Sequence, residues 1–143
     1  MMKQRFRTVA FVGLAAVSAL LVLFLCGFGR NQLSVRQIER IELTAQGGTA
    51  VVELKPEDVR KFVTRYNLSR YVGTVTAENC EKTFFVRIEL NDGSYISMLD
   101  YEGARMKVIS SEAENFWVDN VLLLHTIQKL AEDYGLTLET WGC

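Results

Sequence analysis

The sequence has few of the residues that build catalytic and metal sites. Its 143 residues include one histidine, three cysteines and one proline. His125 belongs to no recognisable catalytic motif with a nucleophile and an orienting acid. A structural zinc site needs four closely spaced ligands, which the scattered cysteines and His125 do not supply. No motif that binds a nucleotide is present. The sequence therefore predicts no catalytic residues, no metal and no cofactor.

Acidic residues are absent from the first 38 positions, where one hydrophobic segment dominates. Three basic residues precede this segment, residues 8–29 carry no charge, and Arg30 follows. At about 1.5 Å per residue, a helix of these 22 residues spans roughly 30 Å, the thickness of a bilayer's hydrocarbon core. Basic residues ahead of such a segment favour a cytoplasmic N-terminus. We therefore expect residues 1–30 to be a basic tail and a transmembrane signal-anchor, with the rest of the chain outside the cytoplasm.

Two other interpretations of this segment remain open. A cleaved signal peptide needs small residues before the cut, which residues 27–29 supply poorly, and its apolar core is usually shorter. A lipoprotein signal would place a lipid on Cys26, but Leu25 stands where a small residue is expected. The uncleaved anchor fits the length best, and Cys26 is then an ordinary apolar residue of the membrane helix.

The remainder of the chain is acidic. All 17 acidic residues and 12 of the 16 basic residues follow Arg30, which gives this part a net charge of −5. Nucleic acids bind to clustered basic surfaces, so we expect no nucleic acid partner. Residues 31–37 are predicted to be a polar linker, and residues 38–143 have the length of one extracytoplasmic domain.

Hydrophobic periodicity predicts an α+β fold for residues 38–143. We expect a hairpin over residues 38–54, one helix from Pro56, and a second helix capped by Asp119 or Asn120. Strands are predicted over residues 68–77, 84–90, 95–101, 104–108 and 115–118. Because short connections favour antiparallel pairing, we expect an antiparallel meander sheet with both helices packed on one face.

The turn at residues 91–93 decides which side chains share a face of this sheet. A three-residue loop would set Ile88 opposite Ile96 and keep the apolar face continuous, so we prefer it to a two-residue loop. Four large side chains then lie on the other face: Phe85, Tyr95, Leu99 and Tyr101. Such a surface is typical of binding sites, and we expect it to bind a partner unless the segment around Trp141 covers it.

The expected domain contains one pair of cysteines. Cys80 follows a predicted strand and Cys143 is the last residue of the sequence. In an oxidising compartment they could form a disulfide, remain free, or pair between chains. An internal bridge would contribute about 2–4 kcal/mol to stability.

The order of several segments resembles a group of bacterial envelope proteins. The segments that carry the resemblance are the basic tail, the apolar segment and, after them, residues 38–43, 56–59, 88–94 and 116–119. Together they resemble small membrane-anchored proteins and lipoproteins that Gram-positive bacteria hold outside the cytoplasm. The resemblance covers most of residues 36–135. It implies a compartment and no functional residues.

These observations predict a binding or accessory module of the cell envelope that is not an enzyme. Its expected partners are the membrane, through the N-terminal helix, and an envelope protein or peptide. Two other functions remain open: a small envelope hydrolase built around His125, and an immunity or inhibitor protein whose sheet face blocks one target.

Overall fold

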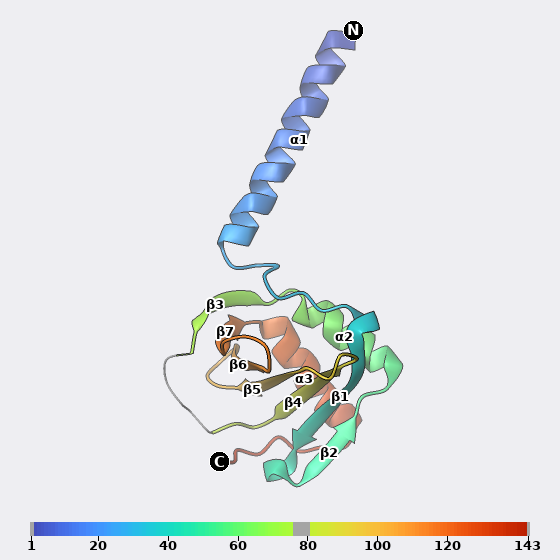
Figure 1. Cartoon of the computed structure of the whole chain (residues 1–143), viewed down its shortest axis with the longest axis vertical. Coiled ribbons are helices and arrows are strands. Elements are labelled where there is room, and N and C mark those ends of the chain that lie inside the picture. The colour runs from blue at the N-terminus through green and yellow to red at the C-terminus, as the bar shows by residue number, and fades with distance from the viewer. Residues whose placement is uncertain (1, 76–80, 143) are drawn as a thin grey trace.

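The computed structural model of the protein describes residues 2–75 and 81–142. One helix projects from a folded domain that holds the other elements (Figure 1). In chain order the elements are α1 (Met2–Leu25), β1 (Ile38–Ala45), β2 (Ala50–Glu53), α2 (Pro56–Tyr66), β3 (Arg70–Thr74), β4 (Phe85–Leu90), β5 (Tyr95–Asp100), β6 (Arg105–Ser110), β7 (Phe116–Asp119) and α3 (Val121–Asp133).

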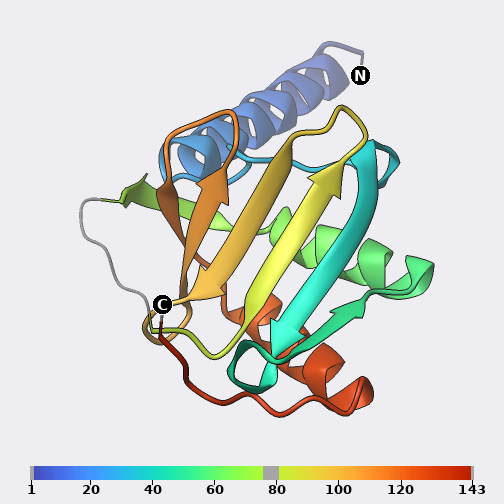
Figure 2. The same ribbon diagram turned by 60° about the horizontal axis from the view of Figure 1, so that its bottom comes forward.

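The strands form one antiparallel sheet in the order β2-β1-β4-β5-β6-β7-β3. β4 to β7 are neighbours both in the chain and in the sheet, so the predicted meander covers these four strands. β3 follows α2 in the chain but pairs with β7 at the far edge. α2 runs behind the sheet from the β2 side to the β3 side, which carries the chain past the central strands (Figure 2). The predicted α+β class with an antiparallel sheet is confirmed, and the meander is limited to its central part.

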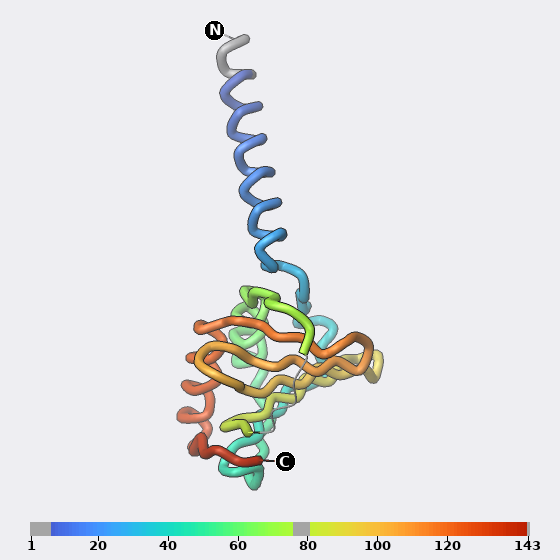
Figure 3. Tube along the Cα trace, turned by 90° about the vertical axis from the view of Figure 1, so that its left-hand side faces the viewer, coloured from blue at the N-terminus to red at the C-terminus, as the bar shows by residue number. Residues whose placement is uncertain are grey.

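α2 and α3 lie side by side against one face of the sheet, as predicted (Figures 2 and 3). Pro56 is the first residue of α2, and the side chain of Asn120 caps α3 by accepting the Leu123 N–H. The two helices bury one stripe each, made of Phe62, Val63 and Tyr66 in α2 and of Leu123, Ile127, Leu130 and Ala131 in α3. Burial of each large apolar side chain stabilises the fold by about 1.5–3 kcal/mol.

The register of β4 and β5 follows the three-residue loop. Ile88 lies opposite Ile96, as predicted, and Val86 lies opposite Met98. Gly93 supplies a φ of 86° in the turn, a value that L side chains rarely adopt. Because side chains alternate along a strand, this register sends one set to the helices and the other set to the opposite face.

The segment between α1 and β1 is bound to the domain. The Tyr71 N–H donates to the Gly27 carbonyl oxygen over 2.9 Å. Leu33 is buried, and the Asn67 side chain hydrogen-bonds to both its N–H and its carbonyl oxygen, at 2.7 and 2.8 Å. The residues expected to be a linker, 31–37, therefore begin packed against the domain.

The described residues of the domain do not pack over the apolar part of α1. Its part from Arg7 to Leu25 is long and apolar enough to cross a membrane, a property that signal sequences share. All of its described side chains are exposed. An exposed apolar surface of this size is expected to lie in lipid or against another protein.

After α3 the chain runs along one end of the sheet (Figure 2). The Gln46 N–H donates to the Thr137 carbonyl oxygen at 3.0 Å, and Trp141 forms an antiparallel bridge with Lys82. Within residues 135–142 this bridge is the only β pairing. The described part of the tail lies beside the β1–β2 turn and does not cover the sheet face opposite the helices.

Candidate functional site

The sheet face turned away from α2 and α3, here called the open face, has no second layer within the described residues (Figure 3). Pairing across five strands gathers one row of side chains on it: Thr44, Phe85, Leu99, Lys107 and Trp117. The neighbouring row contains Glu42, Arg87, Ser97 and Ile109. Residues that are distant in the chain therefore form one continuous surface, because directly opposed residues of a sheet share a face.

The middle and the β7 side of the open face are aromatic and aliphatic. Leu99 is buried there between its opposed neighbours Phe85 and Lys107. Tyr101 follows the last residue of β5, is exposed, and holds its ring 4.7 Å from that of Trp117. The sequence predicted Phe85, Tyr95, Leu99 and Tyr101 on this face. The first three lie on it within strands, and Tyr101 joins it through Trp117.

The β1 side of the open face carries an ion-pair network. Arg40 approaches Glu89 at 2.9 Å and Glu42 at 3.4 Å, and the Arg87 Nε donates to Glu89 at 3.2 Å. The hydrogen bond from Arg87, with that from Arg40, holds the pKa of the Glu89 carboxyl below its usual range. The Arg87 guanidinium also lies 4.1 Å from the centre of the Tyr95 ring. These contacts hold two arginines and a tyrosine in defined positions.

Ser97 lies near the centre of the open face and is 2% exposed. Its Oγ has no hydrogen-bond partner in the described part of the chain. An unsatisfied buried hydroxyl costs about 1–3 kcal/mol. The Arg87 and Ile109 side chains come from the strands on either side of it.

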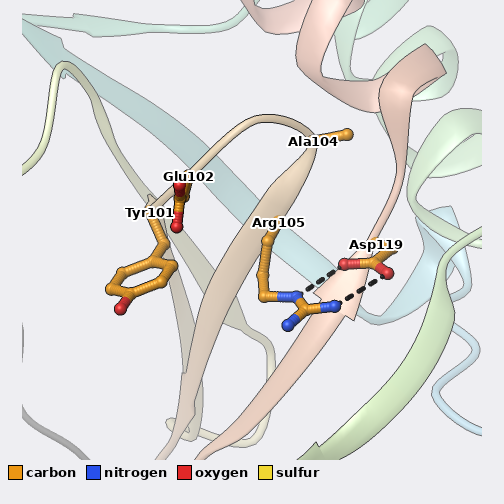
Figure 4. A pocket seen from close by; sticks show the side chains of 5 residues that line it. All are labelled: Tyr101, Glu102, Ala104, Arg105 and Asp119. Carbon is orange, nitrogen blue, oxygen red and sulfur yellow. Dashed lines mark hydrogen bonds and ion pairs between the residues drawn. The ribbon is translucent and has the colours of Figure 1, made fainter.

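A hollow of about 310 Å³ lies at the end of the open face where β6 begins (Figure 4). Arg105 donates to both carboxylate oxygens of Asp119, at 2.8 and 3.2 Å, and Arg70 reaches the same carboxylate at 3.0 Å. The hydrogen bond from Arg105, with that from Arg70, lowers the pKa of Asp119. Tyr101 and Glu102 line the other side of the hollow. Arg105 and Arg70 carry one more charge than the Asp119 carboxylate neutralises, and Glu102 offsets this remaining positive charge.

The other residues selected from the sequence lie elsewhere. Cys26 follows the end of α1 with an exposed free thiol. Cys80 and Cys143, the proposed disulfide pair, lie outside the described residues. His125 is exposed on α3, in the layer behind the sheet rather than on the open face. Within residues 2–75 and 81–142 no group of three or more His, Cys, Asp or Glu side chains could hold a metal ion.

Sequence reasoning missed Trp117, Arg87 and Lys107 as members of this surface. A signal for Trp117 was present, because alternation in the strand at residues 116–119 turns it away from the buried Val118. What the sequence did not contain was the order of the strands. Only the pairing of β6 with β7 brings Trp117 beside Lys107 and within reach of Tyr101.

The open face contains residue types that are common in protein interfaces. Tyrosine, tryptophan, phenylalanine and arginine are enriched at the centres of protein interfaces, and all four types occur here. Its chemistry has to be judged from its own residues. Comparison of the chain with protein-family models, with curated proteins and with solved structures finds no match.

Proposed function

We propose that the protein is a single-pass membrane protein whose domain lies outside the cytoplasm and binds another envelope protein through the open face. The proposal includes no catalytic step. The observation that carries it is the aromatic surface around Phe85, Trp117 and Tyr101, which no layer of described residues covers, on a domain joined to one apolar helix.

The anchor and its direction are supported by the first 30 residues. The side chains of α1 after Arg7 are exposed and mostly apolar, so water is an unfavourable surrounding for them. The three basic residues at its start favour a cytoplasmic N-terminus. The domain then lies on the opposite side of the membrane.

A protein partner is supported by the pattern of the open face. Interface hot spots are large aromatic and arginine side chains that are already well ordered, surrounded by polar groups at the rim. The ring contact between Tyr101 and Trp117 and the Arg87–Tyr95 contact order such side chains before any partner arrives. Preordering reduces the entropy lost on binding.

The proposal is tested by capture of a partner with tagged full-length protein from gently solubilised membranes. Replacement of Tyr95 and Trp117 by alanine removes two aromatic anchors, each worth about 1–2 kcal/mol or more at an interface core. We expect binding to weaken by roughly 30- to 700-fold. The quantity measured is the amount of partner recovered from several dilutions of the solubilised membranes at one salt concentration. Thermal unfolding checks that the domain of the variant stays folded.

The matched control replaces His125 and Gln128, two exposed residues of α3, by alanine. Because α3 lies behind the sheet, this variant should recover the partner as the original protein does. It also removes the imidazole that the alternative hydrolase would need. Recovery of no partner above background, or equal recovery by the open-face variant and the control, would contradict the proposal.

An extracytoplasmic domain also predicts a disulfide between Cys80 and Cys143. Lys82 and Trp141 exchange two backbone hydrogen bonds, at 3.0 and 2.9 Å, and each stands two positions from one of these cysteines. This pairing brings together the two segments that lead to the cysteines, which themselves lie outside the described residues.

The bridge is measured on protein isolated with its thiols blocked. Intact mass and thiol titration should find one free thiol, that of Cys26, and Cys80→Ser should lower the free energy of unfolding by about 2–4 kcal/mol. Cys26→Ser is the control and should change neither the bridge nor the stability. Three titratable thiols in freshly isolated protein would show that the bridge is absent.

A further inference from the structure

An exposed apolar patch lies where the domain meets α1. We call it the membrane-proximal patch. It consists of Phe28, Leu68, Val121 and Leu122, which are between 37% and 51% exposed and line one shallow hollow of about 370 Å³. Val121 and Leu122 form the first turn of α3, and Leu68 follows the end of α2. Three separate segments therefore bring apolar side chains to one place on the surface.

The patch is held close to the end of the apolar helix. Phe28 stands three residues after Leu25, the last residue of α1, and pairs with Arg70 at the start of β3. Gly27 hydrogen-bonds to Tyr71 and has a φ of 94°, and a Cβ at this position would collide with the Tyr71 carbonyl oxygen. The junction is therefore a fitted contact between backbones, and it fixes which end of the domain is nearest to α1 (Figure 1).

The surroundings of the patch match the boundary between lipid and water. The Arg30 guanidinium lies 5.7 Å from the ring centre of Phe24 and 5.0 Å from that of Tyr71. Arginine and aromatic rings of this kind gather where a membrane helix leaves the hydrocarbon core. Apolar side chains on an interfacial surface enter the membrane by roughly 5–10 Å.

We propose that the membrane-proximal patch rests in the lipid interface, so that the domain is seated on the bilayer rather than held away from it. The inference depends on the proposed function, because α1 must be inserted for the patch to reach the lipid. Its occupant is the headgroup and upper acyl region of the leaflet on the domain's side. The seating orients the open face relative to the membrane surface.

The test uses full-length protein in vesicles of phosphatidylcholine and phosphatidylglycerol, with bromine on the acyl chains of half of the preparations. Leu122→Trp and, separately, Leu68→Trp add a fluorophore in the patch. The emission of Trp117 and Trp141, measured on the original protein, is subtracted from the emission of each variant. The control is Val51→Trp, a site that is 57% exposed on β2, at the end of the domain away from α1 (Figure 1).

We expect the added emission of both patch variants to be blue-shifted and to lose most of its intensity in brominated vesicles. Val51→Trp should instead be quenched by aqueous iodide and be insensitive to bromine. Vesicle flotation separates the two proposals. Protein that floats with the vesicles while its patch tryptophans respond only to iodide would overturn the seating and leave the anchor intact. Protein that does not float would overturn the anchor and the seating together. Blue-shifted emission that is insensitive to bromine and depends on protein density would indicate a second copy on the patch and would overturn the lipid assignment.

Discussion

Replacement of Leu14 and Val17 by arginine in the full-length protein is expected to release it from the membrane. Both side chains are more than 60% exposed near the middle of α1, so the domain does not depend on them. Each arginine at the centre of a membrane helix opposes insertion by roughly 2.5–3.5 kcal/mol. Two of them should therefore shift the insertion equilibrium by about 10⁴- to 10⁵-fold.

The measurement is the fraction of protein that stays in the membrane pellet after an alkaline carbonate wash. Leu14→Ala with Val17→Ala is the control, because it shortens the same side chains without adding charge and should remain in the pellet. If the original protein is washed off, or if the arginine variant is retained as firmly as the alanine variant, α1 is not a membrane anchor.

The second large effect is expected at Asn120. Its side chain is 6% exposed and makes three hydrogen bonds: it accepts from the Leu123 N–H at 2.9 Å and donates to the Arg65 carbonyl oxygen and the Ser69 Oγ, both at 2.8 Å. One residue therefore caps α3 and ties it to the end of α2. Asn120→Ala removes the cap, worth about 0.5–2 kcal/mol, and leaves buried partners unsatisfied at about 1–3 kcal/mol.

We expect Asn120→Ala to lower the free energy of unfolding by about 2–4 kcal/mol. The measurement is urea-induced unfolding of the detergent-solubilised full-length protein, followed by tryptophan fluorescence. Asn115→Ala is the control, because Asn115 is exposed and its backbone carbonyl, which accepts the Val75 N–H, is unchanged. A change below about 0.5 kcal/mol at Asn120, the range of ordinary surface substitutions, would contradict the role assigned to its side chain.

Helix boundaries and local register could be predicted because their causes lie within a few residues. Pro56 and Asn120 begin the two helices of the domain, and both act on backbone groups of the adjoining turn. The loop length between β4 and β5 decided that Ile88 faces Ile96. The same alternation correctly separated the core side chains from those of the open face.

The composition of the candidate site could be predicted only in part. Tyr95 and Phe85 follow from one hairpin, but Trp117 reaches Tyr101 only because β6 lies between β5 and β7. The ion-pair partners of the charged residues could not be predicted from the sequence either. Arg105 and Arg70 share Asp119 because β3 joins the sheet beside β7.

The sequence by itself determined the apolar helix, the two domain helices, the hairpins and the alternation of side chains between the two faces of the sheet. These features depend on turn chemistry and on periods of 3.6 and 2 residues, which act over about ten positions. Only the tertiary structure decided that β3 lies at the far edge, that Gly27 fits against Tyr71, and that Phe28, Leu68 and Leu122 form one patch. Each of these contacts joins distant parts of the chain, and which of them form depends on how all the elements bury their apolar surfaces at once.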